Sequence, residues 1–302
     1  PVDGNGECIE TVPRLGYRFV APVSRMMPPP APDTATSAAA APRPAINLDA
    51  LIEPHRMFVE GRAALETMTR SAVERARTAL EALVAAHPDE ASFHVALANA
   101  CALQFDATRI DPEPDHALLA RAEALAERAC ALRPHYGDAW ATLGFIRARQ
   151  RRPGDAEAAC ERAVGLDPDN WRHLIRLAEV SWGETRLSAA RRALALSPGL
   201  PLASWHIATV YVARGALDAA CRQIDEALRV MPDAEAGSAR FAAVGLWWMK
   251  GLLLLRRGDG DSAAEAFARE LEHETRGHVY SREMAANTWY AIGALRVRTN
   301  NA

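Results

Sequence analysis

The chain has 302 residues, of which 49% are hydrophobic and 24% are charged, an ordinary balance for a globular protein of one or two domains. Its formal net charge of −3 excludes a basic field that would draw the whole chain to nucleic acid or to anionic membranes. Five scattered cysteines with no CxxC pair indicate reduced thiols, and so a cytoplasmic protein, rather than a disulfide framework or a zinc site.

The first predicted element is a β-hairpin in the stretch IETVPRLGYRFVAPV, residues 9–23. Two runs of β-branched or aromatic residues, IETV and YRFV, flank the turn sequence PRLG. In that turn Pro13 presets φ and Gly16 can adopt a positive φ. Because a two-stranded hairpin alone is only marginally stable, we expect it to pack on something or to belong to a larger domain.

The sequence TVPRLGYRFVAPV resembles the wing that closes the winged-helix DNA-binding domain of OmpR-type regulators, in the form found in ToxR- and CadC-like bacterial regulators. Residues 1–23 are therefore interpreted as the truncated end of such a domain, whose helix-turn-helix would lie upstream. The resemblance implies that Arg14 reaches DNA and that Arg18 contacts its backbone, both only within the complete N-terminal domain. The alternative is an unrelated hairpin.

Residues 24–50 are predicted to form a disordered linker. This segment contains six prolines and a run of alanines, with almost no residue that could build a core. Residues 51–302 then show an Ala-rich helical pattern that is punctuated by prolines at spacings of 34, 30 and 34 residues: Pro134, Pro168, Pro198 and Pro232. Periods of this size are typical of stacked helical repeats.

The repeat columns resemble the tetratricopeptide repeat. In the unit that ends at Pro168, Trp140, Gly144, Ala156 and Ala163 occupy the large and small positions of that pattern. The resemblance implies an all-α fold, a right-handed superhelical solenoid of antiparallel helix pairs, with about six units plus the first helix of a seventh. The unit that ends at Pro198 is four residues short, near the sequence WGETR, and an earlier unit carries about 12 extra residues, DATRIDPEPDHA, between its helices.

Three stretches invite other readings. The apolar run 241–255 is shorter than the about 20 residues of a membrane span and is expected to be a buried helix. In EHETRGH, His273 and His278 are five residues apart, which does not suit a helical metal pair, and a solvated helix end is expected. DPEPDH is expected to be an exposed loop. No pairing of a nucleophile with a base is found, so we expect no catalysis, no metal and no cofactor.

The resemblance also implies that first-helix columns line a concave groove. We expect a long, open surface of mixed aromatic and basic character that binds a protein or peptide partner. For Trp182 and Trp205 the alternative is packing between repeats, and Trp205, Trp248 and Arg256 are the expected anchors. The groove residues are Asn99, Phe145, Arg149, Glu179, Trp182, Trp205, Thr209, Trp248, Leu252, Arg256, Tyr290 and Arg298.

Together these features suggest the sensor or interaction region of a soluble bacterial transcription regulator, in which partner binding controls the N-terminal DNA-binding domain. A homodimer would hold two such domains. One alternative is a scaffold that assembles protein complexes without acting on a promoter. The other is a repeat region attached to a catalytic domain.

Overall fold

The computed structural model describes residues 9–12, 16–19, 48–230, 244–275 and 277–300, in two units that divide between residues 46 and 47. In the first unit, strands β1 (Ile9–Val12) and β2 (Gly16–Phe19) pair antiparallel, with Glu10 opposite Arg18. They coincide closely with the two expected runs. Arg14 and most of the expected linker lie outside the described residues.

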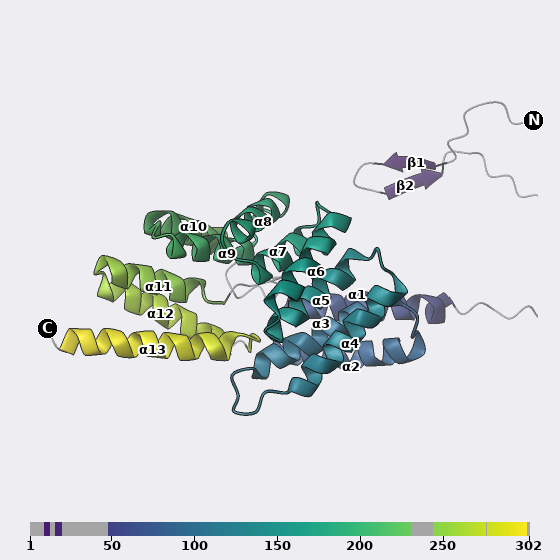
Figure 1. Ribbon diagram of the computed structural model, residues 1–302, viewed down its shortest axis with the longest axis horizontal. Coiled ribbons are helices and arrows are strands. Elements are labelled where there is room, and N and C mark those ends of the chain that lie inside the picture. The colour runs from purple at the N-terminus through teal and green to yellow at the C-terminus, as the bar shows by residue number, and fades with distance from the viewer. Residues whose placement is uncertain (1–8, 13–15, 20–47, 231–243, 276, 301–302) are drawn as a thin grey trace, which may run out of the picture. The chain divides into compact units, whose positions relative to one another are not determined.

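The described part of the second unit is a chain of thirteen helices (Figure 1). Six antiparallel pairs follow one another, α1 with α2 through α11 with α12, and α13 comes last, which confirms the expected helical solenoid. Their bounds are α1 Leu48–Glu66, α2 Arg70–Ala86, α3 Ala91–Thr108, α4 His116–Leu132, α5 Gly137–Arg149, α6 Pro153–Leu166, α7 Trp171–Val180, α8 Gly183–Leu196, α9 Pro201–Ala213, α10 Leu217–Val230, α11 Leu246–Arg257, α12 Gly260–Thr275 and α13 Ser281–Asn300.

Glycine permits the close approach of the two helices within a pair. A Cβ atom at Gly144 would overlap Sγ of Cys160 and lie 2.7 Å from the carbonyl oxygen of Ala156, both on the facing helix α6. A Cβ at Gly251 of α11 would overlap the ring of Phe267 on α12 in the same way. The predicted repeat register is therefore correct at both positions.

The two irregular units depart from the expected geometry. Helix α7 has 10 residues where α5 has 13, and Arg186 of the next helix compensates, because its guanidinium donates hydrogen bonds to carbonyls at the end of α7, including those of Ala178 and Ser181. In the other unit the inserted residues do not form only a loop. They extend α3 to 18 residues, and Asp106 in this extension is buried.

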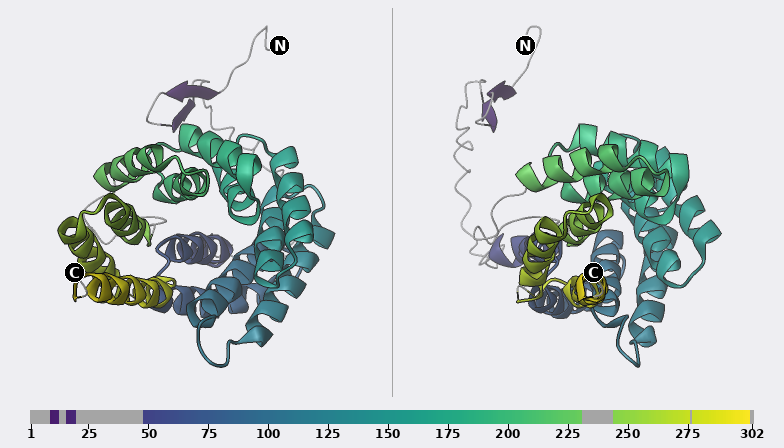
Figure 2. Two further views of the ribbon diagram at one scale, coloured as in Figure 1. Left: turned by 60° about the vertical axis from the view of Figure 1, so that its left-hand side comes forward. Right: turned by 90° about the vertical axis from the view of Figure 1, so that its left-hand side faces the viewer.

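The turn between α12 and α13 closes the solenoid on its own beginning. The Val279 amide donates to the Met68 carbonyl at 2.8 Å, the Arg70 amide donates to the Gly277 carbonyl at 2.9 Å, and Thr69 and His278 form an isolated antiparallel bridge. The last described helices thus return to the first, and Figure 2 shows this circuit. The expected solvated helix end is found at Glu272, Glu274 and Thr275, which are exposed, but not at His273 and His278, which are buried.

From Leu246 onward the apolar run is a packed helix of the solenoid, as expected. Met249 and Leu253 on α11 are buried against α10. Over the described residues, no helix combines the length and the hydropathy that crossing a membrane would require.

Gly144→Ala should lower the free energy of unfolding by about 1–3 kcal/mol, because the new methyl group has no room between α5 and α6. Gly154→Ala is the matched control, since nothing lies within 4 Å of a Cβ there and the change should be neutral or slightly stabilising. Urea denaturation followed by circular dichroism measures both. Equal effects of the two substitutions would contradict the packing described for α5 and α6.

Candidate functional site

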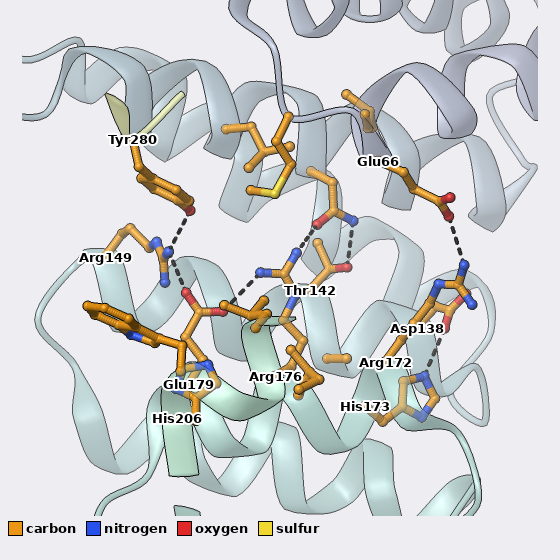
Figure 3. A pocket seen from close by; sticks show the side chains of 18 of the residues that line it. Glu66, Asp138, Thr142, Arg149, Arg172, His173, Arg176, Glu179, His206 and Tyr280 are labelled. Carbon is orange, nitrogen blue, oxygen red and sulfur yellow. Dashed lines mark hydrogen bonds and ion pairs between the residues drawn. The ribbon is translucent and has the colours of Figure 1, made fainter. Parts of the chain in front are cut away.

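The closed circuit surrounds a cavity of about 530 Å³. Side chains from the first helix of each of the six pairs line it, together with the start of α13 and Arg186 from α8. The volume lies within the about 300–1,000 Å³ of ordinary ligand pockets. Figure 3 shows part of the wall.

One end of the cavity is closed by a buried charge cluster around Asp106. Its carboxylate accepts hydrogen bonds from Arg149, with Nη2 to Oδ2 at 3.0 Å, and from the Tyr280 hydroxyl at 2.6 Å. Burial and the neighbouring Asp106 carboxylate raise the pKa of Tyr280. Burial opposes the charge of Arg149, but its carboxylate neighbours outweigh that effect and raise its pKa well above the usual value. The cluster is therefore ionic and holds the turn after α12 against α3 and α5.

Arg109, at the end of α3, extends this closing cluster. Its Nε donates to the carboxylate of Glu283 on α13 at 2.9 Å, and its guanidinium lies 5.1 Å from the ring centre of Tyr280. Nearby, Arg282 forms an ion pair with Asp111 at 2.7 Å. Arg109 and Asp111 thus bind the start of α13, while Pro112, Glu113 and Asp115 form the exposed loop that the sequence predicted.

A second network crosses the middle of the cavity wall (Figure 3). Glu179 accepts a hydrogen bond from Arg149 at 2.6 Å and forms an ion pair with Arg176 at 3.2 Å. Arg176 also donates to Asn99 at 3.1 Å. Burial opposes ionisation of Glu179, but the two arginines lower its pKa to about 2. Both guanidiniums stack on Phe145, at 3.6 and 3.5 Å from the ring centre.

The opposite end of the cavity holds a looser group of charges. Arg172 donates to Glu66 at 2.7 Å, and Nε2 of His173 lies 2.8 Å from Asp138 (Figure 3). Burial opposes ionisation of Asp138, but its hydrogen bond with His173 and, to a smaller extent, the charge of Arg62 at the same end lower its pKa. Arg62 lies over the ring of Phe58 at 5.6 Å, and no described carboxylate forms an ion pair with it. It is a half-buried cation that a ligand can reach.

An aromatic wall completes the cavity. The rings of Trp205 and Trp248 lie 6.4 Å apart at the cavity lining. The position of Trp248 depends on Glu270, whose buried carboxylate accepts the backbone N–H groups of Gly245 at 2.8 Å and Trp248 at 3.1 Å. It therefore caps the start of α11. Burial raises the pKa of Glu270 to about 7, although these hydrogen bonds oppose the shift.

The cavity lining carries more positive than negative charge. Among the described residues, neither Arg62 nor Arg186 forms an ion pair with a carboxylate, and burial lowers the pKa of His206 to about 4, so this imidazole is neutral near pH 7. Asp106, just behind this wall, also pairs with Arg149, so the wall can accept about one negative charge from a ligand. Six arginines, Arg62, Arg109, Arg149, Arg172, Arg176 and Arg186, line the cavity beside four carboxylates, Glu66, Asp138, Glu179 and Glu283.

The structure brings only part of the predicted groove together. Five of the twelve residues line the cavity: Asn99, Arg149, Glu179, Trp205 and Trp248. Phe145 is buried beneath two arginines, Thr209 accepts a hydrogen bond from Arg186, and Leu252 packs between α11 and α12. The side chain of Arg298 lies outside the described residues.

The other three predicted residues lie away from the cavity, at exposed positions. Trp182 is 61% exposed because it follows the shortened α7, where the helical columns no longer apply. Tyr290 is 82% exposed on α13, and Arg256 is exposed at the end of α11. Sequence reasoning missed Arg62, Arg172 and Arg176, although all three lie on first helices. It also missed Tyr280, which lies in a turn that the repeat pattern does not describe.

Comparison with known proteins agrees with this architecture. Residues 62–109 and 115–171 match the model of the tetratricopeptide repeat family. These two segments of the chain are therefore tetratricopeptide repeats. No curated protein matches it, and no comparison relates its hairpin to a winged-helix domain.

Two solved structures share the fold of the tetratricopeptide solenoid. Human IFIT1 aligns with a TM-score of 0.59 and 16% identity, over 74% of this chain and 53% of that one. A Cut9–Hcn1 hetero-tetramer structure aligns with a TM-score of 0.56 and 16% identity, over 85% of this chain and 44% of that one. The present chain therefore spans about half the length of these two proteins.

In the part that the structure describes, no cluster of His, Cys, Asp and Glu could hold a metal ion.

The Glu270 cap should make stability depend on pH. Glu270 has a folded pKa of about 7 and an ordinary unfolded value, so the folded state retains a proton that the unfolded state has released. Its contribution to stability is present below the unfolded pKa and is lost as the pH rises through about 7. As the pH rises from about 5 to about 8, the unsubstituted protein loses this contribution and the Glu270→Gln variant does not. The free energy of unfolding of the variant should therefore increase by about 1–3 kcal/mol relative to that of the unsubstituted protein.

Chemical denaturation at several pH values measures this difference. His206, with its lowered pKa, contributes stability that increases with pH over part of the same range, but it is common to both proteins and cancels. Glu265→Gln, at an exposed position of the same helix, is the control. The difference in free energy of unfolding between this variant and the unsubstituted protein should not change with pH. A pH-independent difference for Glu270→Gln would show that the carboxylate ionises normally.

Proposed function

We propose that the solenoid is a protein-interaction module that binds a short peptide segment of a partner protein in its central cavity, without catalysis. The observation that carries this proposal is the central cavity, which is open to solvent on part of its boundary, with its surplus of arginine and its tryptophan wall. The sequence suggested a long open groove, but the contact between the α12–α13 turn and Met68 joins the two ends of the solenoid around the concave face. A folded partner domain cannot enter a space of about 530 Å³, whereas a peptide of a few residues can.

The charge of the wall selects the chemistry of the peptide. Among the described residues Arg62 forms no close ion pair with a carboxylate and acts on Asp138 only at longer range, so an acidic side chain or a terminal carboxylate can pair with it directly. Trp205 and Trp248 offer an apolar surface for an aromatic or aliphatic side chain. The preferred segment therefore combines an acidic group with a large apolar one.

This function agrees better with a scaffold than with a transcription regulator. The repeat match supports an interaction role, while no comparison supports DNA binding. The regulator hypothesis adds a winged-helix domain upstream and stays a prediction, and with it stay the proposed DNA contacts of Arg14 and Arg18. A DNA-binding assay on the complete reading frame would decide between the two.

Selection of a random peptide library on the purified protein tests the proposal. The recovered peptides should be acidic and should contain an aromatic or large aliphatic residue. For a selected peptide, Arg62→Gln should weaken binding about 10-fold, which corresponds to the loss of one charged contact of about 1.4 kcal/mol. Fluorescence anisotropy measures the dissociation constant.

The control for charge is Arg128→Gln, an exposed arginine on α4 that does not line the cavity and should leave binding unchanged. A matched peptide in which lysine replaces each acidic residue should not bind. Recovery of basic peptides, or equal affinity of the Arg62→Gln and Arg128→Gln proteins, would contradict the proposal.

A further inference from the structure

The wall of the cavity has a notch where α7 ends early. Helices α5, α7 and α9 each begin three residues after a repeat proline, so their starts are level. They have 13, 10 and 13 residues, and at a rise of about 1.5 Å per residue α7 ends about 4.5 Å short of its two neighbours. Since these first helices form the cavity wall, its rim is lower beyond Val180 than at Arg149 of α5 or Ala213 of α9.

Arg186 of α8 fills the base of this notch. Its guanidinium donates hydrogen bonds to carbonyl groups at the end of α7, those of Ala178, Glu179 and Ser181. On the α9 side of the notch it donates to the hydroxyl of Thr209 at 3.4 Å. Each nitrogen of the guanidinium is therefore engaged, and the group is held in one position. Because Arg186 also lines the cavity, the notch is continuous with the cavity wall.

The ring of Trp182 lies over this fixed guanidinium, with Cζ of Arg186 3.9 Å from the ring centre. One face of the ring is thus covered, yet Trp182 is 61% exposed. Single exposed apolar side chains are common on protein surfaces, but this one contacts a residue of the cavity wall. A tryptophan that is fixed on one face and open on the other can bind an apolar side chain at a small entropic cost.

We propose that the bound peptide leaves the cavity through this notch and that Trp182 binds its next apolar side chain. The inference rests on the proposed function, because the segment in the notch belongs to the same peptide. A peptide longer than the cavity must cross its rim, and α7 is the shortest of the described helices. The guanidinium of Arg186 on one face of the ring disfavours a second cation on the other face, so the residue bound there is aromatic, aliphatic or proline rather than basic.

A second round of peptide selection tests this inference. A core peptide recovered from the random library is kept constant, and a few random residues are added at either end. The best extension should contain an aromatic, large aliphatic or proline residue and should bind about 10-fold more tightly than the core peptide alone. With Trp182→Ala most of this gain should disappear, whereas Trp182→Phe keeps an aromatic face and should retain most of it. Fluorescence anisotropy measures the dissociation constants of the core and extended peptides, and circular dichroism verifies that both variants fold.

The matched control is Trp289→Ala, which removes a similarly exposed tryptophan, 56% accessible, from α13 outside the cavity lining. It should leave the gain from the extension unchanged. A gain that survives Trp182→Ala, equal losses in the Trp182→Ala and Trp289→Ala proteins, or an extension that brings no gain would overturn this inference and leave the proposed function standing. Failure to recover any core peptide would instead overturn the proposed function, and this inference with it.

Discussion

The buried carboxylate of Asp106 is the constraint on which the rest of the solenoid depends. It binds Arg149 of α5 and the hydroxyl of Tyr280, two groups that are 131 residues apart in the sequence. A buried arginine is costly to desolvate, and only well-placed carboxylates offset that cost. Because Asp106 lies on α3, Arg149 on α5 and Tyr280 in the turn before α13, the cluster forms only when the circuit is closed. Loss of Asp106 would leave the charge of Arg149 buried with one carboxylate neighbour fewer.

Closure changes what the repeats can do. In an open solenoid each repeat contacts only its neighbours, so curvature can vary along the whole array. Here the backbone of Val279 binds that of Met68, so the first helix pair, α1 with α2, is joined to the turn that follows the last pair. The concave face becomes a bounded cavity, which in the proposed function takes a short acidic segment rather than an extended partner.

The sequence predicts the repeats well because their packing is local. The small residue at Gly144 and the Ala-rich facing helix follow from one period, and the structure places them in contact. The same columns predict that the side chains of Asn99, Arg149 and Trp205 point to the concave face, and all three line the cavity. The columns do not predict the position of Trp182, because its repeat is four residues short and α7 ends at Val180, before this residue.

The closure could not be predicted from the repeat pattern. Asp106 lies in an insertion and Tyr280 in a turn, and neither position has a column in the repeat. The two residues are separated by 174 positions, and no local periodicity reports a contact at that distance. For the same reason the cavity was expected to be an open groove.

An engineered disulfide across the closure tests it most directly. Thr69 and His278 form an antiparallel bridge, and the Cα separation of such pairs, about 4.5–5.5 Å, suits a disulfide. In a chain with Cys8 and Cys221 replaced by serine, Thr69→Cys with His278→Cys should cross-link completely under mild oxidation, with a faster-migrating band on non-reducing gels. Adding Asp106→Ala should slow the cross-linking. Absence of the bond in the folded protein, while each single variant folds normally, would contradict a closed solenoid.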